Sequence, residues 1–185
     1  MKRIVVGISG ASGIPIAIEV LRAIKEQPEW QSSLVMTDGA VKTIELETSY
    51  HIEQIQMLAD ECHDIKNIGA SIASGTYKTE GMIVVPCSMK TVAGIASGYS
   101  DNLLLRAADV TLKERRKLVL VARETPFNTI HLRNMLELSQ MGAIILPPML
   151  TFYNKPQSMD DMVNHIAGKI LDVFDIEYQK LCRWS

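Results

Sequence analysis

This chain of 185 residues has few cysteines and few aromatic residues, and neither charge is in clear excess. The three cysteines, Cys62, Cys87 and Cys182, are an odd number without a CxxC pair, which argues against a disulfide framework and a structural zinc site. Lys and Arg number 19 against 21 Asp and Glu, so the composition gives no support for a nucleic-acid or polybasic membrane partner. With only 5% aromatic residues, aliphatic side chains and the 10 methionines must fill the core.

Long apolar runs are also missing. No segment approaches the roughly 20 apolar residues that span a bilayer, and the apolar stretch after Met1 is too short for a signal peptide. We therefore expect a protein of the cytoplasm. Apolar residues make up 47% of the chain and charged residues 22%, which is typical of a globular protein, and the length favours a single domain over residues 1–185.

Short apolar runs alternate with segments of helical periodicity along the whole chain. The runs predict buried strands, because four to six apolar residues without alternation are typical of a parallel sheet covered on both faces. The expected strands are Ile4–Ser9, Ser33–Thr37, Met82–Val85, Lys117–Ala122 and Ala143–Leu146. The expected helices are Pro15–Glu26, Val41–Ala59, Lys90–Ser97, Leu103–Arg116, Thr129–Met141 and Met159–Tyr178. This order predicts an α/β fold, a three-layer sandwich around a Rossmann-like parallel sheet.

The segments that follow these strands carry small, hydroxyl-bearing and charged residues. In open parallel sheets, ligands bind beyond the carboxyl ends of the strands, so five such loops together indicate a site. The loops are Ser9–Gly13, Thr37–Gly39, Pro86–Thr91, Arg123–Pro126 and Pro147–Met149.

The first loop, Gly10–Gly13, enters a predicted helix whose first turn contains Pro15. Backbone N–H groups at such a position can hold an anion, although an ordinary tight turn explains the residues equally well. The glycines are spaced GxxGxxG rather than GxGxxG, and Asp38 could imitate an acidic residue that binds a ribose. NAD binding is therefore a second-rank alternative.

In the third loop, Ser88–Thr91, two hydroxyls and Lys90 suit a phosphate or the polar edge of a flavin, and a capped helix start is the alternative.

Several charged residues have both a structural and a functional interpretation. Arg106 and Lys113 lie on one face of a predicted helix with Asp109 between them, so a solvated salt-bridge ladder is the default explanation. Arg123 and Glu124 follow a buried strand, where a charged pair is costly unless it is used, and here we favour a function.

The four histidines, His51, His63, His131 and His165, are scattered without metal-ligand spacing, and we interpret each as a surface or capping residue. Cys87 is interpreted as a small buried hydrophobe, because no nearby histidine indicates an activated thiolate.

Taken together, the motifs closely resemble those of the UbiX-type flavin prenyltransferases, a family long described as aromatic acid decarboxylases. The resemblance is collinear and covers essentially the whole domain. It runs through Gly7–Gly13, Pro86–Thr91, Leu105–Arg116, Arg123–Pro126, Ile130–Met135 and Pro147–Tyr153. A series of motifs in this order is far more specific than any one of them.

The resemblance implies a Rossmann-like fold of the flavin-containing cysteine decarboxylase type, with FMN held between subunits of a dodecamer built from trimers. It implies that a dimethylallyl group passes from dimethylallyl phosphate to N5 and C6 of reduced FMN. The product would be the prenylated FMN cofactor of a partner decarboxylase of the UbiD type. No metal is expected. Which pathway is served, and whether the donor is the phosphate or the pyrophosphate, stays open.

The resemblance also implies roles for individual residues. FMN contacts are expected from Gly10, Ala11, Ser12, Thr37, Ser88, Met89, Lys90, Thr91 and Arg123. The prenyl phosphate is expected to bind Tyr153, Lys169, Arg106 and Lys113, and catalytic roles are expected for Ser12, Lys113, Glu124 and Trp184. Cations and a phenol suit a departing phosphate, and a tryptophan ring suits an allylic cation. Glu124 is hypothesised to shuttle a proton, with the departing phosphate as base.

Two alternatives stay open. The related FMN-dependent cysteine decarboxylases carry an Asn after the Met of a Pro-x-Met motif, whereas Leu150 follows Met149 here, and Lys90 replaces the Asn of their phosphate loop. A non-catalytic flavin-binding subunit is the other alternative. It would not need the second set of phosphate-binding residues that the resemblance implies.

Overall fold

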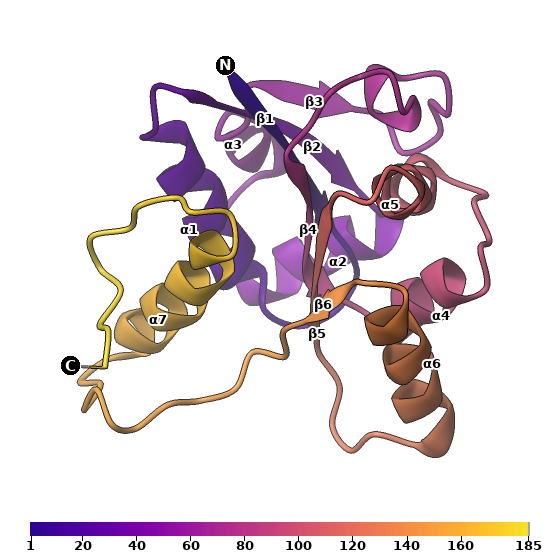
Figure 1. Ribbon diagram of the computed structural model, residues 1–185. Coiled ribbons are helices and arrows are strands. Elements are labelled where there is room, and N and C mark those ends of the chain that lie inside the picture. The colour runs from indigo at the N-terminus through magenta and orange to yellow at the C-terminus, as the bar shows by residue number, and fades with distance from the viewer. Residues whose placement is uncertain (185) are drawn as a thin grey trace.

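The computed structural model describes residues 1–184 and shows a sheet of parallel strands with helices on both faces (Figure 1). The six strands lie in the order β3-β2-β1-β4-β5-β6. Their bounds are β1 Lys2–Ile8, β2 Trp30–Met36, β3 Glu61–His63, β4 Gly81–Cys87, β5 Lys117–Ala122 and β6 Ile144–Ile145. Every neighbouring pair is parallel, which confirms the predicted three-layer α/β sandwich.

The helices divide between the two faces of the sheet. Helices α1 and α7 pack side by side over one face, and α4, α5 and α6 cover the other (Figure 1). The bounds are α1 Ile14–Lys25, α2 Asp38–Glu47, α3 Ile52–Gln56, α4 Met89–Ala96, α5 Leu103–Lys113, α6 Thr129–Gln140 and α7 Met159–Asp172, with a 3-10 turn at Ser71–Ala73. Within residues 1–184, no helix has the length and apolar character needed to cross a membrane.

Two apolar cores result, because alternate residues of each strand point to opposite faces. On β1, Ile4 and Ile8 belong to the core under α1 and α7, while Val5 belongs to the core under α4, α5 and α6. All three side chains are at most 2% exposed. Burial on both faces explains why these strands read as continuous apolar runs in the sequence.

Two expected helices differ from the structure, and one strand lies outside the expected set. The expected helix Val41–Ala59 is wrong: α2 ends at Glu47, and α3 begins after His51. The break falls at Thr48, whose extended backbone ends the helix, and His51 starts the next one. The helix expected to reach Tyr178 ends at Asp172, because Asp175 adopts a left-handed φ of 57°. Strand β3 was not predicted, since its three residues, Glu61–His63, form no apolar run and lie at the sheet edge.

Candidate active site

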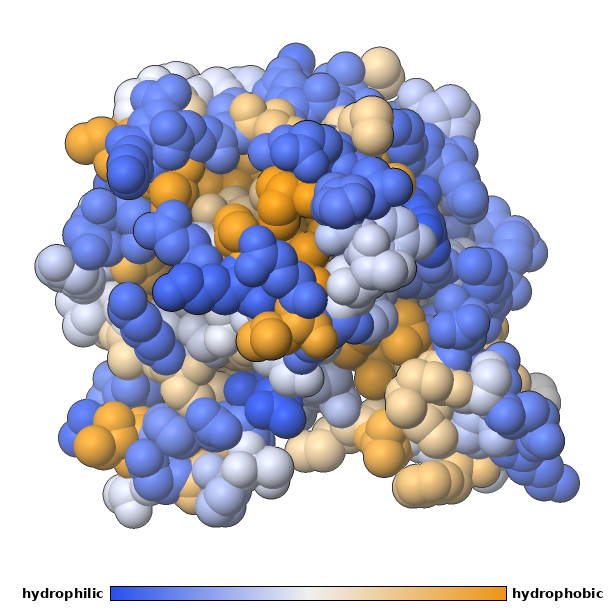
Figure 2. Space-filling model, turned by 180° about the vertical axis from the view of Figure 1, so that it is seen from behind, coloured by the Kyte–Doolittle hydropathy of each residue, from blue (hydrophilic) through white to orange (hydrophobic). Residues whose placement is uncertain are grey.

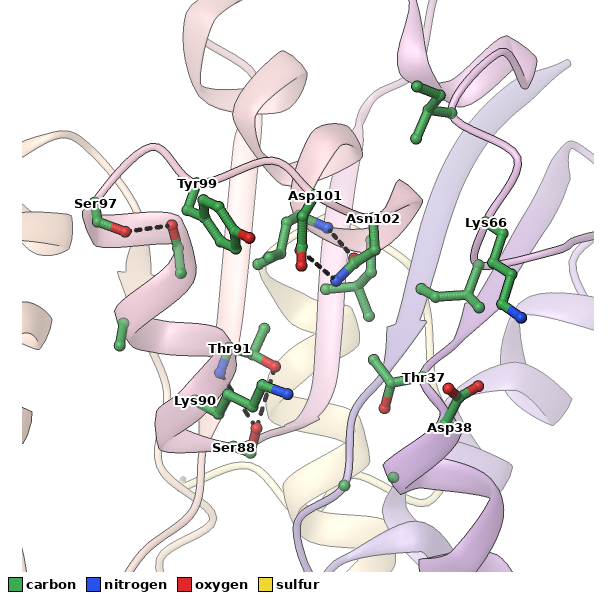
Figure 3. Close-up of a pocket in the computed structure, with 18 residues that line it drawn as sticks. Thr37, Asp38, Lys66, Ser88, Lys90, Thr91, Ser97, Tyr99, Asp101 and Asn102 are labelled. Carbon is green, nitrogen blue, oxygen red and sulfur yellow. Dashed lines mark hydrogen bonds between the residues drawn. The ribbon is translucent and has the colours of Figure 1, made fainter.

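A cavity of about 860 Å³ opens where β1, β2 and β4 end, at the carboxyl edge of the sheet (Figure 3). Residues from the loops after all three strands line it, as the topology predicts. The lining includes Gly10, Thr37, Asp38, Gly39, Ile65, Lys66, Ile68, Ser88, Lys90, Thr91, Tyr99, Asp101, Asn102, Leu104 and Leu105. Its volume lies within the usual range for sites that bind small molecules and cofactors.

Three helices begin at the wall of this cavity. The N-cap residues of α2, α4 and α5 are Thr37, Ser88 and Asn102, and each accepts a hydrogen bond from a backbone N–H of its own first turn. The Ser88 hydroxyl also lies 3.1 Å from that of Thr91. Because helix N-termini carry partial positive charge and unpaired N–H groups, their convergence favours an anionic ligand.

Two glycines allow the first and second loops to touch. A Cβ placed on Gly10 would lie 2.9 Å from the backbone of Gly39, a distance that leaves no room for a side chain. Buried Ser9 then joins the first loop to the third: its hydroxyl donates to the Pro86 carbonyl at 2.9 Å and accepts from the Ser88 N–H at 2.8 Å. The backbone of these loops can therefore approach a ligand closely, and the Ser9 hydrogen bonds hold the first and third loops together.

The lining of the cavity combines charged and hydroxyl-bearing side chains with apolar ones. Lys90 projects beside Ser88 and Thr91 (Figure 3), and Lys66 stands on the opposite wall. Apolar lining comes from Ile65, Ile68, Leu104 and Leu105, with the ring of Tyr99 nearby. A phosphate at the α4 start and a planar apolar group beyond it would both find matching surfaces.

The start of α1, by contrast, is already occupied by a carboxylate. Oε2 of Glu47 accepts hydrogen bonds from the N–H groups of Gly13 and Ile14, both at 3.0 Å. Pro15 has no N–H to offer, so of the two interpretations of this loop the structure favours the tight turn over an anion site at the Gly13 and Ile14 N–H groups. No local pattern in the sequence indicates this partner, because Glu47 lies 34 residues from Gly13 and 33 residues from Ile14 along the chain.

A second cluster surrounds Tyr153 on the α7 side of the sheet. The Tyr153 hydroxyl lies 3.4 Å from Nε2 of His165, and its ring packs edge-on against Trp184 with 5.1 Å between centroids. Lys169, one turn after His165 on α7, lies 3.8 Å from a carboxylate oxygen of Asp172. Burial and then the charge of Lys169 lower the pKa of His165, so the buried imidazole favours its neutral form. The interpretation of His165 as a surface or capping residue is therefore wrong.

The family model for flavoproteins matches residues 1–171 of this chain. The flavin prenyltransferase LpdB of Lactiplantibacillus plantarum is 53% identical over 185 residues, which cover 100% of this chain and 99% of that protein. A probable UbiX-like flavin prenyltransferase of Sedimentibacter hydroxybenzoicus is also 53% identical, over 99% of this chain and 97% of the relative. The chain belongs to the UbiX-type flavin prenyltransferase family.

Solved structures agree with this family membership. A dodecameric FMN-dependent UbiX-like decarboxylase from Escherichia coli O157:H7 superposes with a TM-score of 0.98 at 50% identity, covering 99% of both chains. AnUbiX in complex with FMN and dimethylallyl pyrophosphate gives 0.97 at 48% identity, over 100% of this chain and 97% of that one. The cysteine decarboxylase SpaF shares the fold alone, with a TM-score of 0.63 at 18% identity, over 80% of this chain and 84% of that one.

Five of the residues that the UbiX-type resemblance assigns to FMN line the cavity. These are Gly10, Thr37, Ser88, Lys90 and Thr91. Ala11 and Ser12 lie in the same first loop but outside the lining, and Met89 packs into the core under α4. The Arg123 N–H donates to the Cys87 carbonyl at 3.0 Å, which places its backbone at the same sheet edge, and its side chain is exposed.

The remaining assigned residues are spread over the chain. Arg106, on α5, binds Asp109 at 2.6 Å, as the salt-bridge interpretation predicts. Lys113 instead pairs with Glu114 and lies against Gly75, just before β5 begins, at the amino edge of the sheet. Glu124 accepts a hydrogen bond from the Thr125 N–H at 3.1 Å. A single chain therefore does not bring Lys113 to the cavity.

Sequence reasoning missed Glu47 and Asn102, and it misread His165. Asn102 carried a signal, because an Asn directly before the apolar run at Leu103 is a typical N-cap. The interpretation of Cys87 is confirmed: the side chain is fully buried, and burial raises the pKa of its thiol. Within residues 1–184, no three His, Cys, Asp or Glu side chains are grouped so that they could hold a metal ion.

Proposed function

We propose that this chain transfers a dimethylallyl group from dimethylallyl phosphate to N5 and C6 of reduced FMN. The observation that carries the proposal is the cavity. In a chain about half identical to flavin prenyltransferases over its full length, three helix starts surround a pocket large enough for a flavin nucleotide. Helix α2 follows β2, and α4 and α5 follow one another between β4 and β5. We assign all three starts to one FMN-binding domain spanning residues 1–185.

The cavity suits FMN at both of its ends. The FMN phosphate would lie at the start of α4, where the Ser88 and Thr91 hydroxyls, backbone N–H groups and the Lys90 ammonium are available. The flavin ring would lie against Ile65, Leu104 and the neighbouring apolar lining. The nucleotide would therefore be gripped through its charged end and oriented through its planar end.

The prenyl donor requires a second phosphate-binding region, and we assign it to the Tyr153 cluster. Tyr153 is 45% exposed and Lys169 55% exposed in its side chain, so both can reach a ligand outside their own subunit. The Trp184 ring beside Tyr153 offers an electron-rich face to an allylic cation. AnUbiX, which is 48% identical, is known in complex with both FMN and dimethylallyl pyrophosphate.

Self-association would join the two regions. The UbiX-like relative from Escherichia coli O157:H7 is dodecameric, and we propose a homo-oligomer, a dodecamer, here as well. Hydrophobic side chains reach the surface in several patches rather than one (Figure 2). On α6 and the segment after β6 the exposed ones are Ile130, Leu132, Leu136, Met149, Leu150 and Phe152. Such surface fits contact with further copies of the chain, which would carry Lys113, Arg106 or Tyr153 to a neighbour's cavity.

The residues then divide the chemistry between them. The allylic C–O bond breaks with its electron pair on the phosphate oxygen, N5 forms the new C–N bond, and the N5 proton passes to the phosphate. Tyr153, Lys169, Arg106 and Lys113 would stabilise the growing phosphate charge.

Closure of the new ring is a second step. The bond to C6 requires the prenyl double bond to gain a proton and C6 to lose one. We assign that transfer to Glu124, which is half-buried at the same sheet edge, with Ser12 in the neighbouring first loop.

The experiment is anaerobic incubation of the purified protein with reduced FMN and dimethylallyl phosphate, followed by mass spectrometry of the released flavin. A flavin heavier by one C5H8 unit supports the proposal, and a parallel reaction with the pyrophosphate defines the donor. Unmodified flavin beside intact donor would contradict it and leave a non-catalytic flavin-binding subunit. Glu124→Gln should slow closure of the ring at C6 more than attachment at N5.

We further propose that the product serves a UbiD-type decarboxylase and that the protein acts in the cytoplasm. Adding the reaction mixture to an apo-decarboxylase of that type should restore decarboxylation. Supplying prenylated FMN directly should make this protein unnecessary for that restoration. If decarboxylation still required the protein, a direct role in decarboxylation would have to replace the supply of cofactor.

A further inference from the structure

The C-terminal segment after α7 has little backbone structure to hold it. Residues 173–184 form no helix or strand, and within Glu177–Trp184 one backbone hydrogen bond is made, from the Leu181 N–H to the Tyr178 carbonyl at 3.2 Å. Nevertheless this segment ends with the Trp184 ring packed on Tyr153. Because fixing a chain without backbone pairing costs conformational entropy, side-chain contacts must determine where Trp184 lies.

The strongest of these contacts is to Glu19, in the middle of α1. Oε1 of Glu19 accepts hydrogen bonds from the Tyr178 hydroxyl at 2.6 Å and from the Lys180 ammonium at 2.7 Å. Oδ1 of Asn164, on α7, lies 2.8 Å from the same Tyr178 hydroxyl. One carboxylate therefore connects α1 and α7 to the segment that carries Trp184.

Glu19 is 8% exposed, which is unusual for a carboxylate on the apolar side of a helix. Burial by itself would raise the pKa of Glu19, but the hydrogen bonds from Lys180 and Tyr178 lower it below its usual value. The ionised carboxylate is thus the form that the segment stabilises. A buried charge with its partners removed is costly, so the contact is sensitive to the loss of any one group.

Two further contacts guide the segment from Lys180 to Trp184. The Leu181 side chain lies over Gly168 of α7, where an added Cβ would come within 2.8 Å of it. Arg183 binds Asp172, the carboxylate that also lies 3.8 Å from Lys169. Along α7 the segment therefore runs past Lys169 before it reaches Tyr153.

We propose that Glu19 is a positioning residue for the prenyl-donor region, acting through Tyr178 and Lys180 to hold Trp184 against Tyr153. This inference rests on the proposed function, since Tyr153, Lys169 and Trp184 are assigned there to the donor. Glu19 itself does not touch the donor or the flavin. Removal of the Glu19 carboxylate should loosen the donor region and leave the FMN cavity unchanged, since Glu19 does not line that cavity.

The test uses Glu19→Gln in the full-length protein, with Glu177→Gln as the matched control. Glu177 lies in the same segment and is exposed, and its carboxylate bonds only to the Gln179 side chain among residues 1–184. In Glu19→Gln the KM for dimethylallyl phosphate should rise roughly tenfold, as expected for a misplaced positioning group. The Kd for FMN should stay within about twofold of the native value, and the control should match the native protein in both.

Tryptophan fluorescence supplies a readout that is independent of activity. The chain has two tryptophans, of which Trp30 is 5% and Trp184 is 78% exposed. With Trp184→Phe used to isolate the Trp30 signal, the fluorescence anisotropy of Trp184 should be lower in Glu19→Gln than in the native protein, because the exposed ring would move more freely once it leaves Tyr153. Tyr178→Phe and Lys180→Met should do the same, and a double variant with Glu19→Gln should add little, because all three share one contact.

The outcomes separate the two proposals. If the native protein attaches no prenyl group, the proposed function fails while the anisotropy assay still measures what holds Trp184. If the native protein is active but Glu19→Gln changes neither the anisotropy of Trp184 nor the KM, the inference is overturned. It is also overturned if FMN affinity, KM and thermal stability all decline together, since that pattern marks a general structural role. Should Glu19→Gln fail to fold, Tyr178→Phe and Lys180→Met decide the question with the same measurements.

Discussion

The cavity at the carboxyl edge of the sheet and the cluster around Tyr153 differ in what holds their side chains in place. Around the cavity, strand ladders, helix caps and the short side chain of buried Ser9 fix the backbone. Around Tyr153, long side chains such as Lys180 and Arg183 reach from a segment without helix or strand. The first region is therefore preorganised by the fold, and the second depends on individual contacts.

This difference matches what each region is proposed to bind. A flavin that must be oriented at two atoms requires a rigid surface, because small errors of placement cost much of the rate. The prenyl donor binds and its phosphate is released in each turnover, so its binding region can be less rigid. Variants in the cavity should therefore change the affinity for FMN, and variants in the Tyr153 cluster should change the KM for the donor.

The largest expected effect comes from Gly10→Ala. Its Cβ would meet the Gly39 backbone at 2.9 Å, so the two loops must separate. Overpacking of this kind costs about 1–3 kcal/mol, and we expect FMN affinity to fall at least about tenfold in flavin titration. Gly69→Ala is the control, since a Cβ there meets only the Asn67 side chain at 3.5 Å. Unchanged FMN binding in Gly10→Ala would show that this contact does not shape the cavity.

Sequence alone goes far for the preorganised region and much less far for the other. The strand ends and the hydroxyls of Thr37 and Ser88 follow from local pattern, because caps and turns are encoded within a few residues. The Glu47 contact to α1 and the Glu19 contact to Tyr178 join residues far apart in the chain. No local sequence pattern indicates such a pair, so only the structure reveals these contacts.

Tyr153→Phe should give the next largest effect, and it tests the donor region rather than the cavity. Loss of a hydroxyl hydrogen bond to a charged phosphate costs about 1.5–3 kcal/mol, so the donor KM should rise at least roughly tenfold. FMN affinity should not change, because Tyr153 lies outside the cavity lining. Steady-state kinetics beside a flavin titration measures both quantities. A parallel loss of FMN affinity would contradict the separation of the two regions.

Ser88→Ala should produce a smaller loss that is confined to the cavity. Removing the N-cap of α4 costs about 1 kcal/mol of stability, and the lost hydroxyl should weaken FMN binding about fivefold. Ser97→Ala is a matched control, because Ser97 lines the same cavity from the other end of α4 and, within residues 1–184, its hydroxyl bonds only to the Gly94 carbonyl. Equal effects of the two substitutions would show that the helix start is not where the phosphate binds.

The smallest effect concerns His165, which lies between Tyr153 and Lys169. Burial, and then Lys169, hold its folded pKa below the ordinary value of 6.5, so near and below that pH the unfolded chain binds more protons than the folded one. Stability should therefore fall as the pH drops from about 6.5 toward the folded pKa, by less than about 1.4 kcal/mol per pH unit for one proton.

Urea denaturation of the native protein and of His165→Phe across that pH range measures this contribution. The variant should lose the part of the slope that belongs to His165, and Lys169→Met should reduce it, because removing a nearby positive charge brings the folded pKa closer to its ordinary value. Identical pH profiles for the native protein and His165→Phe would mean that the imidazole titrates as it does in the unfolded chain. The Tyr153 cluster would then be as open to water as the exposed residues around it, and its contacts could not hold Trp184 in one place.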